Sequence, residues 1–113
     1  MVFYLGNGVT TTRLSVGTTH DSGNITGILP VSGGGQVRVV CKSVDAVIKF
    51  GGSSVEASNT YTSDDLPAGN TVLLAGAIEV FDSPPDATYA SVICEDGSST
   101  GGFVWIQPSY GEK

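Results

Sequence analysis

Positive charge is scarce in this chain. Five Lys and Arg residues stand against eleven Asp and Glu residues among 113, and the formal net charge at pH 7 is −6. Nucleic-acid binding requires clustered Lys and Arg that displace counterions from phosphates, whereas these five are scattered. The sequence therefore predicts no nucleic-acid partner. Charged residues of both signs make up 14% of the chain, against about a quarter in soluble domains, so we expect other subunits to cover part of its surface.

Long apolar runs are also missing. No stretch approaches the roughly 20 apolar residues that a membrane-spanning helix needs. The N-terminal sequence MVFYLGNGVTTTRLSV lacks the basic and the long apolar segments of a signal peptide. We therefore expect no membrane partner and a protein that is made and folded in a cytoplasm.

Cysteine is limited to Cys41 and Cys94. Both have apolar neighbours (VVCK and VICE), and neither belongs to the CxxC spacing that is typical of zinc sites. We predict two buried free thiols that pack as small apolar side chains. A disulfide between them, which would require an oxidising compartment, is the alternative.

Helix-forming residues are few, while Val, Thr, Ile and aromatic residues, which suit a pleated surface, are frequent. Turn signals such as Asn7-Gly8 and Asp96-Gly97 divide the chain into short runs. The eight candidate strands are 10–16, 26–31, 36–43, 46–51, 71–75, 77–81, 87–95 and 102–107. They predict an all-β fold, a single antiparallel β-sandwich over residues 10–113 with a jelly-roll or related Greek-key path. The long polar connection at 52–70 is predicted to be a surface loop that takes part in interactions.

The alternation of apolar residues indicates which faces turn inward. In QVRVVCK, the residues Val37, Val39 and Cys41 share one face, which we assign to the core. In GFVWIQ, apolar residues occupy both faces, so this last strand is expected to be at least partly covered on each side. We place Trp105 in the core.

Catalytic residue types are sparse. His20 is the single histidine and stands beside Asp21 and Ser22 in TTHDSGN. Adjacent residues on an extended chain point in different directions and do not form a Ser-His-Asp relay by themselves. We interpret His20 as an exposed loop residue. No spacing singles out a pair of carboxylates that would face each other across a substrate, so we predict a protein that is not an enzyme and has no cofactor.

Carboxylates in the predicted loops raise the question of calcium. Asp64 and Asp65 with Asn70, or Asp82 with Asp86, offer oxygen ligands of the kind that Ca²⁺ accepts in flexible loops. The twelve-residue EF-hand pattern is absent from the sequence. We therefore expect no metal site.

The larger aromatic residues allow a binding hypothesis. Tyr61, Tyr89, Trp105 and Tyr110 would stack on sugars if several of them shared one exposed face. In the alternative, Trp105 fills the core and the tyrosines sit at strand edges with their hydroxyl groups in water.

The N-terminal residues 1–9 are predicted to form an apolar arm outside the sandwich. Val2, Phe3, Tyr4 and Leu5 are followed by the loose sequence Gly6-Asn7-Gly8. Free in water, such a segment would be an adhesive patch. It therefore folds back on its own sandwich or binds a neighbouring subunit, and we assign Val2, Phe3, Tyr4 and Leu5 as partner-binding residues.

The segments VRVVCKSVDAVIKFGGSSVEA and LPAGNTVLLAGAIEVFDSPPDATYASVICEDGSSTGGFVWIQPSYGEK carry a resemblance to a protein family. In this order the segments contain a strand that ends in FGGSSV, a Pro-Ala-Gly turn, an EVF segment followed by prolines and AT, and a Val/Ile-rich strand. This order resembles that of small all-β proteins of tailed-bacteriophage structural modules. The resemblance covers residues 37 to about 107. Some proteins of this type look like head decoration (cement) proteins.

This resemblance implies a jelly-roll-like, non-enzymatic virion protein on the outer capsid surface. The implied partner is the major capsid protein of the same virion, whose neighbouring subunits it would bridge, and a homo-oligomer (dimer or trimer) is expected. The family contributes no contact motif, so Val2 to Leu5 as the capsid contact remains our own hypothesis. The alternative function is a carbohydrate-binding β-sandwich module of a phage tail or host-contact structure.

Overall fold

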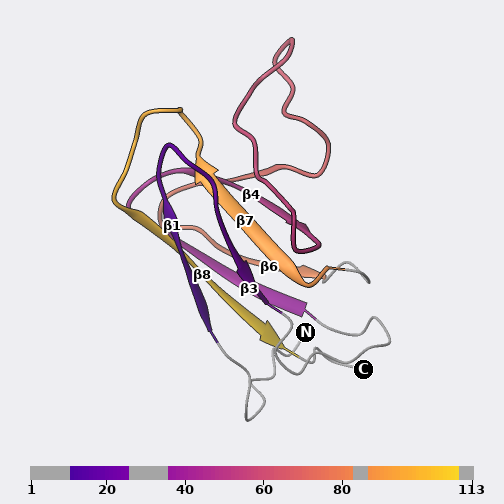
Figure 1. Ribbon diagram of the computed structural model, residues 1–113. Helices are drawn as coiled ribbons and strands as arrows, with labels where there is room; N and C mark the ends of the chain where they lie inside the picture. The colour runs from indigo at the N-terminus through magenta and orange to yellow at the C-terminus, as the bar shows by residue number, and fades with distance from the viewer. Residues whose placement is uncertain (1–10, 26–35, 83–86, 110–113) are drawn as a thin grey trace.

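The computed structural model describes residues 11–25, 36–82 and 87–109, and within them the chain forms strands and no helix (Figure 1). No helix in this part of the chain is therefore long and apolar enough to cross a membrane. The eight strands are β1 (Thr12–Val16), β2 (Asp21–Asn24), β3 (Gln36–Lys42), β4 (Ala46–Gly51), β5 (Thr71–Leu73), β6 (Ile78–Asp82), β7 (Tyr89–Cys94) and β8 (Gly102–Ser109). The predicted all-β class is confirmed.

The strands form two antiparallel four-stranded sheets. Sheet A has the order β1-β8-β3-β6, and sheet B has the order β2-β7-β4-β5. Four of the hydrogen-bonded strand pairs match the first half of the chain to the second half in reverse order, as in one long hairpin. These are β1 with β8, β2 with β7, β3 with β6 and β4 with β5. Wrapping this hairpin around itself adds the pairs β3–β8 and β4–β7. The result is the jelly-roll path, which was one of the two predicted paths through the sandwich.

The core lies between the two sheets and is built from the alternating residues of both. The predicted inward face of β3 is confirmed, because Val37, Val39 and Cys41 are at most 1% exposed. Small β-branched side chains dominate this core, and they fill the narrow space between two packed sheets in well-defined rotamers. The fully buried core residues also include Ile48, Leu73, Ala90, Val92, Cys94, Val104 and Ile106.

Both cysteines are buried free thiols, as predicted. Cys41 lies on β3 of sheet A, and its Sγ donates a hydrogen bond to the carbonyl oxygen of Val44 at 3.2 Å. Burial is the main cause that raises the pKa of the Cys41 thiol, and the charge of nearby Asp45 adds to it. The thiol is therefore held in its neutral form, as expected of a packing residue.

Strand β2 was not anticipated. The predicted strand 26–31 falls outside the described residues, and β2 lies instead in the DSGN stretch that was assigned to a loop. At Gly23, an added Cβ would lie 2.9 Å from methyl groups of Leu14 and Thr12. The glycine thus allows β2 to pass close to β1, where the two sheets meet at one side of the sandwich.

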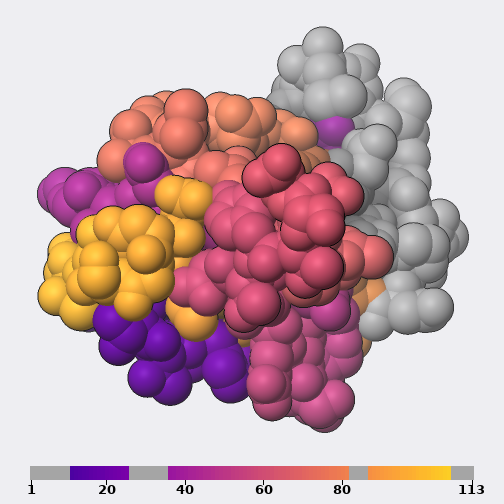
Figure 2. All heavy atoms as spheres, turned by 90° about the horizontal axis from the view of Figure 1, so that it is seen from above, coloured from indigo at the N-terminus to yellow at the C-terminus, as the bar shows by residue number. Residues whose placement is uncertain are grey.

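The connection at 52–70, which we call the strap, lies on the surface as predicted, and most of its residues are exposed. Its packing on the outer face of sheet B was not predicted. Ala57 of the strap is 4% exposed and forms a second apolar cluster with Val47 and Ile93 of the sheet, with Leu66 beside them. Figure 2 shows the strap, in magenta to red, as a continuous part of the molecular surface. Sheet B is therefore covered on both faces.

Candidate functional site

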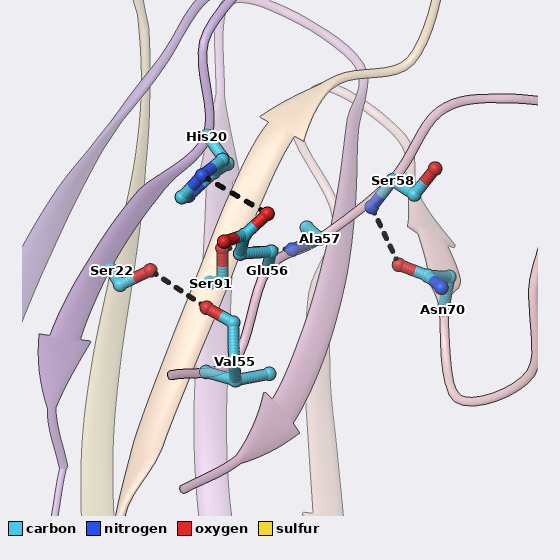
Figure 3. Close-up of polar contacts among 8 residues, drawn as sticks. All are labelled: His20, Ser22, Val55, Glu56, Ala57, Ser58, Asn70 and Ser91. Carbon is cyan, nitrogen blue, oxygen red and sulfur yellow. Dashed lines mark hydrogen bonds and ion pairs between the residues drawn. The ribbon is translucent and has the colours of Figure 1, made fainter. Parts of the chain in front are cut away.

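His20 lies beside Asp21 and Ser22 in the sequence, immediately before β2 begins. The His20 Nε2 atom lies 3.6 Å from the Glu56 Oε1 atom of the strap (Figure 3). Ser22 donates its hydroxyl to the carbonyl oxygen of Val55 at 3.2 Å. The three neighbouring side chains therefore have three different partners, since Asp21 points the other way, toward β1.

The Asp21 carboxylate accepts a hydrogen bond from the backbone N–H of Ser15 at 2.9 Å. This bond ties β2 to β1 across the side of the sandwich. A catalytic relay requires the serine, histidine and carboxylate to contact one another in sequence, and His20, Asp21 and Ser22 are not arranged in that way. Their common role is to hold β1, β2 and the strap together.

The remaining polar contacts in Figure 3 fasten the strap to the rest of the fold. The backbone N–H of Ala57 donates to the Ser91 Oγ atom at 2.9 Å, and Ser91 on β7 is fully buried. The backbone N–H of Ser58 donates to the Asn70 Oδ1 atom at 2.9 Å. These hydrogen bonds satisfy backbone groups that the strap would otherwise bury without partners.

The candidate calcium ligands are partly engaged elsewhere. Asn70 uses its oxygen to bind Ser58 and its amide group to donate to the Pro67 carbonyl oxygen at 2.9 Å. Asp64 and Asp65 belong to a tight turn of the strap. In the second candidate pair, Asp86 lies outside the described residues. Among the residues that are described, no group of three His, Cys, Asp or Glu side chains gathers in a metal-binding arrangement.

Two acidic groups on the surface have perturbed titration. Ser99 and the backbone N–H groups of Ser98 and Ser99 donate to Asp96, and these hydrogen bonds lower the pKa of its carboxyl group to about 2. Tyr61 donates its hydroxyl to the Glu95 Oε2 atom at 2.7 Å, which raises the pKa of the tyrosine. Both arrangements order the turn between β7 and β8 and the strap beside it.

A shallow depression of about 410 Å³ lies where the β1–β2 turn meets the start of β8. Its walls include Ser15, Asp21, Thr100 and Phe103. The single carboxylate there already accepts the hydrogen bond of the Ser15 N–H. The other polar side chains that line the depression are hydroxyl groups, and Asp21 is its one charged residue.

The predicted aromatic platform is dispersed. Trp105 lies on β8 of sheet A, Tyr89 lies on β7 of sheet B, and Tyr61 lies in the strap at 46% exposure. Tyr110 falls outside the described residues, as do the predicted partner-binding residues Val2, Phe3, Tyr4 and Leu5. Trp105, Tyr89 and Tyr61 thus do not share one face.

The placement of Trp105 in the core was wrong. Its neighbours Val104 and Ile106 fill the core at 0% exposure, so the alternation of β8 turns Trp105 to the outer face of sheet A. There it is partly buried beside Phe103, with ring centroids 5.8 Å apart and planes inclined at 51°. The Phe103 and Trp105 rings therefore belong to a surface, whereas Phe50 and Phe81 pack against the core.

The outer face of sheet A is the surface that we call the open face. Strand register and alternation place on it the cations and apolar residues Arg13, Arg38, Val40, Lys42, Ile78, Val80, Phe103 and Trp105. They also place there the polar residues Ser15, Gln36 and Gln107, of which Gln36 is buried at 5% exposure. Among the described connections, only the strap is long enough to cross a sheet, and it packs on sheet B. The exposed fractions of Ile78 and Val80, 58% and 46%, are accordingly high for large apolar residues.

Part of the open face can be recognised from the sequence. The alternation Arg38-Val40-Lys42 and the pair Phe103 and Trp105 each assign residues to one face of one strand. Their assembly into one surface depends on β3 pairing with β8 over seven residues, from Gln36 with Ser109 to Lys42 with Phe103. That pairing joins segments far apart in the chain, so local periodicity does not contain it.

No protein-family model, no curated protein and no solved structure matches this chain. The fold and the open face are therefore the basis on which a function is argued.

Proposed function

We propose that the protein is a non-enzymatic virion structural protein that binds the outer surface of a phage capsid and bridges neighbouring major capsid subunits. The resemblance of residues 37 to about 107 to phage structural proteins motivates this proposal. The observation that supports it is the asymmetry of the sandwich. One sheet is covered by the chain's own strap, while the other presents partly exposed aromatic and aliphatic side chains.

Decoration of a shell requires a rigid body with a binding surface rather than a reactive site. The jelly roll supplies rigidity through its buried core, and the open face supplies apolar area of the kind that marks interaction surfaces. A protein that binds the assembled shell, and not its separated subunits, stabilises the shell by mass action. Many copies on one lattice make a modest affinity per copy sufficient.

Assembly at a local symmetry axis of the shell is part of the same proposal, with the protein acting as a dimer or trimer. The apolar arm residues Val2, Phe3, Tyr4 and Leu5 are proposed to contact the capsid or the neighbouring subunit. In this proposal the site of action is the capsid surface, and the protein needs no cofactor.

The test is co-sedimentation of the purified protein with assembled, undecorated shells of the parent virion, followed by heating of the decorated shells. We expect binding that saturates and shells that resist a higher temperature. Protein that stays in the supernatant at saturating concentration would end the decoration proposal. A variant that lacks residues 1–5 should keep the unfolding midpoint of the full chain and bind shells more weakly; equal binding would remove the arm from the contact.

A carbohydrate-binding module remains the second candidate, because Trp105 lies on a surface together with Phe103. Aromatic faces of this kind stack on sugar rings. The inclination of 51° between the two rings is less suited to an extended glycan than a flat platform. Screening of the labelled protein on immobilised host glycans separates the two functions: specific glycan binding that Trp105→Ala abolishes would favour the second.

A further inference from the structure

We infer that the open face is the docking surface of this protein and that its partner is a protein surface with carboxylates arranged around an apolar centre. The inference rests on the proposed function, because it names the chemistry that the partner must offer at that contact. It is carried by the composition of the face, by the absence of ion pairs at its cations, and by the charge of the rest of the molecule.

Strand register makes the apolar part of the face continuous. Trp105 is the direct cross-strand partner of both Arg13 and Val40, and Val40 is in turn the partner of Ile78. Directly paired residues of antiparallel strands project from the same side of a sheet. One row across all four strands of sheet A therefore consists of an arginine, a tryptophan and two aliphatic residues.

The neighbouring rows add two more cations. Lys42 pairs with Phe103 on one side of this row, and Arg38 pairs with Val80 on the other side. The Arg13 guanidinium carbon lies 4.6 Å from the centroid of the Phe103 ring, so a ring face holds it in place. Tryptophan and arginine at the centre of a patch are the residue types that contribute most to binding at protein interfaces.

The charge of the open face is opposite to that of the whole molecule. Arg13, Arg38 and Lys42 are three of the five Lys and Arg residues in a chain of net charge −6. The one ion pair among the described residues joins His20 and Glu56, so none of these three cations is paired with a carboxylate there. Among the residues that strand register places on this face, Asp82, the partner of Gln36, is the single acidic one, so cations outnumber acids there by three to one.

Unpaired cations around an apolar centre favour an acidic partner. Complementary charge at an interface steers association and excludes wrong partners, while the apolar centre provides most of the affinity. A second copy of the chain docked through the same face would bring the three cations of each copy together. A two-fold interface sets one patch against itself, and like charges in such contact are unfavourable. The occupant is therefore a different protein.

The first experiment removes the cations without touching the core. The triple variant R13Q/R38Q/K42Q is compared with S53D/S54D/T60D, which changes three exposed strap residues. Both lower the net charge by three, so any difference between them reflects position rather than total charge. We expect the first triple to bind shells about tenfold more weakly, equivalent to about 1.4 kcal/mol, and with less dependence on salt, while the control binds like the wild-type protein.

A second pair of variants tests the apolar centre. I78S/V80S removes two exposed aliphatic side chains of the open face, and L74S removes one that is 63% exposed in the turn between β5 and β6. Weakened shell binding by I78S/V80S alone supports the inference. Circular dichroism and the unfolding midpoint show that each variant is folded before its binding is measured.

A readout without shells separates the inference from the proposed function. The probe is a chromatography matrix whose ligand carries a carboxylate beside an aromatic ring. At pH 7 and low salt we expect the wild-type protein to be retained despite its net charge of −6, the control triple to behave likewise, and R13Q/R38Q/K42Q to elute at lower salt.

The outcomes are distinct. If the wild-type protein does not bind shells, the decoration proposal fails. Retention on the carboxylate matrix then still tests whether the open face binds carboxylates. If shells bind all variants equally, the decoration proposal stands and the docking assignment is overturned. If sedimentation velocity shows a wild-type dimer that I78S/V80S dissociates, a second copy occupies the face and the acidic-partner inference is overturned.

Discussion

The hydrogen bond between Ala57 and Ser91 is predicted to be the main polar attachment of the strap. Ser91 on β7 is fully buried, and its Oγ atom accepts the N–H of Ala57, which is itself 4% exposed (Figure 3). Substitution Ser91→Ala deletes the acceptor and leaves the N–H buried without a partner. The side chain shrinks by one atom, so lost packing is a minor part of the effect.

The magnitude follows from burial. Leaving a buried donor unsatisfied costs about 1–3 kcal/mol of unfolding free energy. At roughly 4 °C per kcal/mol for a domain of this size, the melting temperature should fall by about 4–12 °C. Ser22→Ala is the matched control, because Ser22 is exposed and donates to Val55 of the same strap at 3.2 Å. Water replaces that bond, so the control should stay within about 0.5 kcal/mol of the wild-type protein.

Urea unfolding followed by circular dichroism measures both variants. We expect a lower midpoint for Ser91→Ala at an unchanged m-value, since the exposed surface on unfolding is the same. Hydrogen exchange of the Ala57 amide should accelerate in this variant. Equal midpoints for the two variants would refute the reasoning, because identical chemical changes at a buried and an exposed site would then have identical effects.

Other predictions concern the core and the pH dependence of stability. Ile106→Ala removes a side chain of 0% exposure and should lower the unfolding free energy by about 2–5 kcal/mol. Ile78→Ala, at 58% exposure, should change it by less than about 0.5 kcal/mol. Similar urea midpoints for the two variants would show that the two faces of sheet A are misassigned. The Asp96 carboxyl has a pKa of about 2 in the fold against an ordinary 3.8, so its stabilising contribution is complete above about pH 5 and is lost as the pH falls toward 2. The stability difference between wild type and Asp96→Asn should accordingly shrink over that interval, and a difference that persists at pH 2 would contradict the assignment.

Much of the core was predictable from sequence because strands alternate with a period of two. Val37, Val39 and Cys41 alternate with polar residues, so their inward direction follows from local pattern alone. The same logic failed for Trp105. On β8 both faces carry apolar residues, so alternation alone does not say which face turns inward. The closely packed sheets accept Val104 and Ile106 between them and leave the larger ring outside.

The attachment of the strap to sheet B and the position of β2 were not predicted, for a different reason. Residues 52–70 contain few apolar side chains, so their composition resembles that of a solvated loop. Their attachment depends on partners that are distant in sequence, with Ala57 bound to Ser91 and Asn59 donating to the Cys94 carbonyl oxygen at 2.7 Å. Strand β2 has no β-branched residue, and its glycine is required by close approach to β1. Neither signal is visible in local periodicity.

The open face was predictable only in fragments. Each strand carried its own alternation, and the charges of Arg38 and Lys42 were visible in the sequence from the start. Their neighbours on the face come from the other end of the chain, through the pairing of β3 with β8. Strand order determines which residues meet on such a surface. The alternation of residues along each strand says little about strand order.

The position of β8 has a consequence for how the protein is produced. This last strand lies in the middle of sheet A, between β1 and β3. A ribosome that adds about 5–20 residues per second completes β1 roughly ten seconds before β8 exists. During that time β1 has no neighbour in its sheet, and its backbone is available to other nascent chains. A truncation that removes β8 should therefore leave β1 without its partner strand, and more of the product should be found in inclusion bodies.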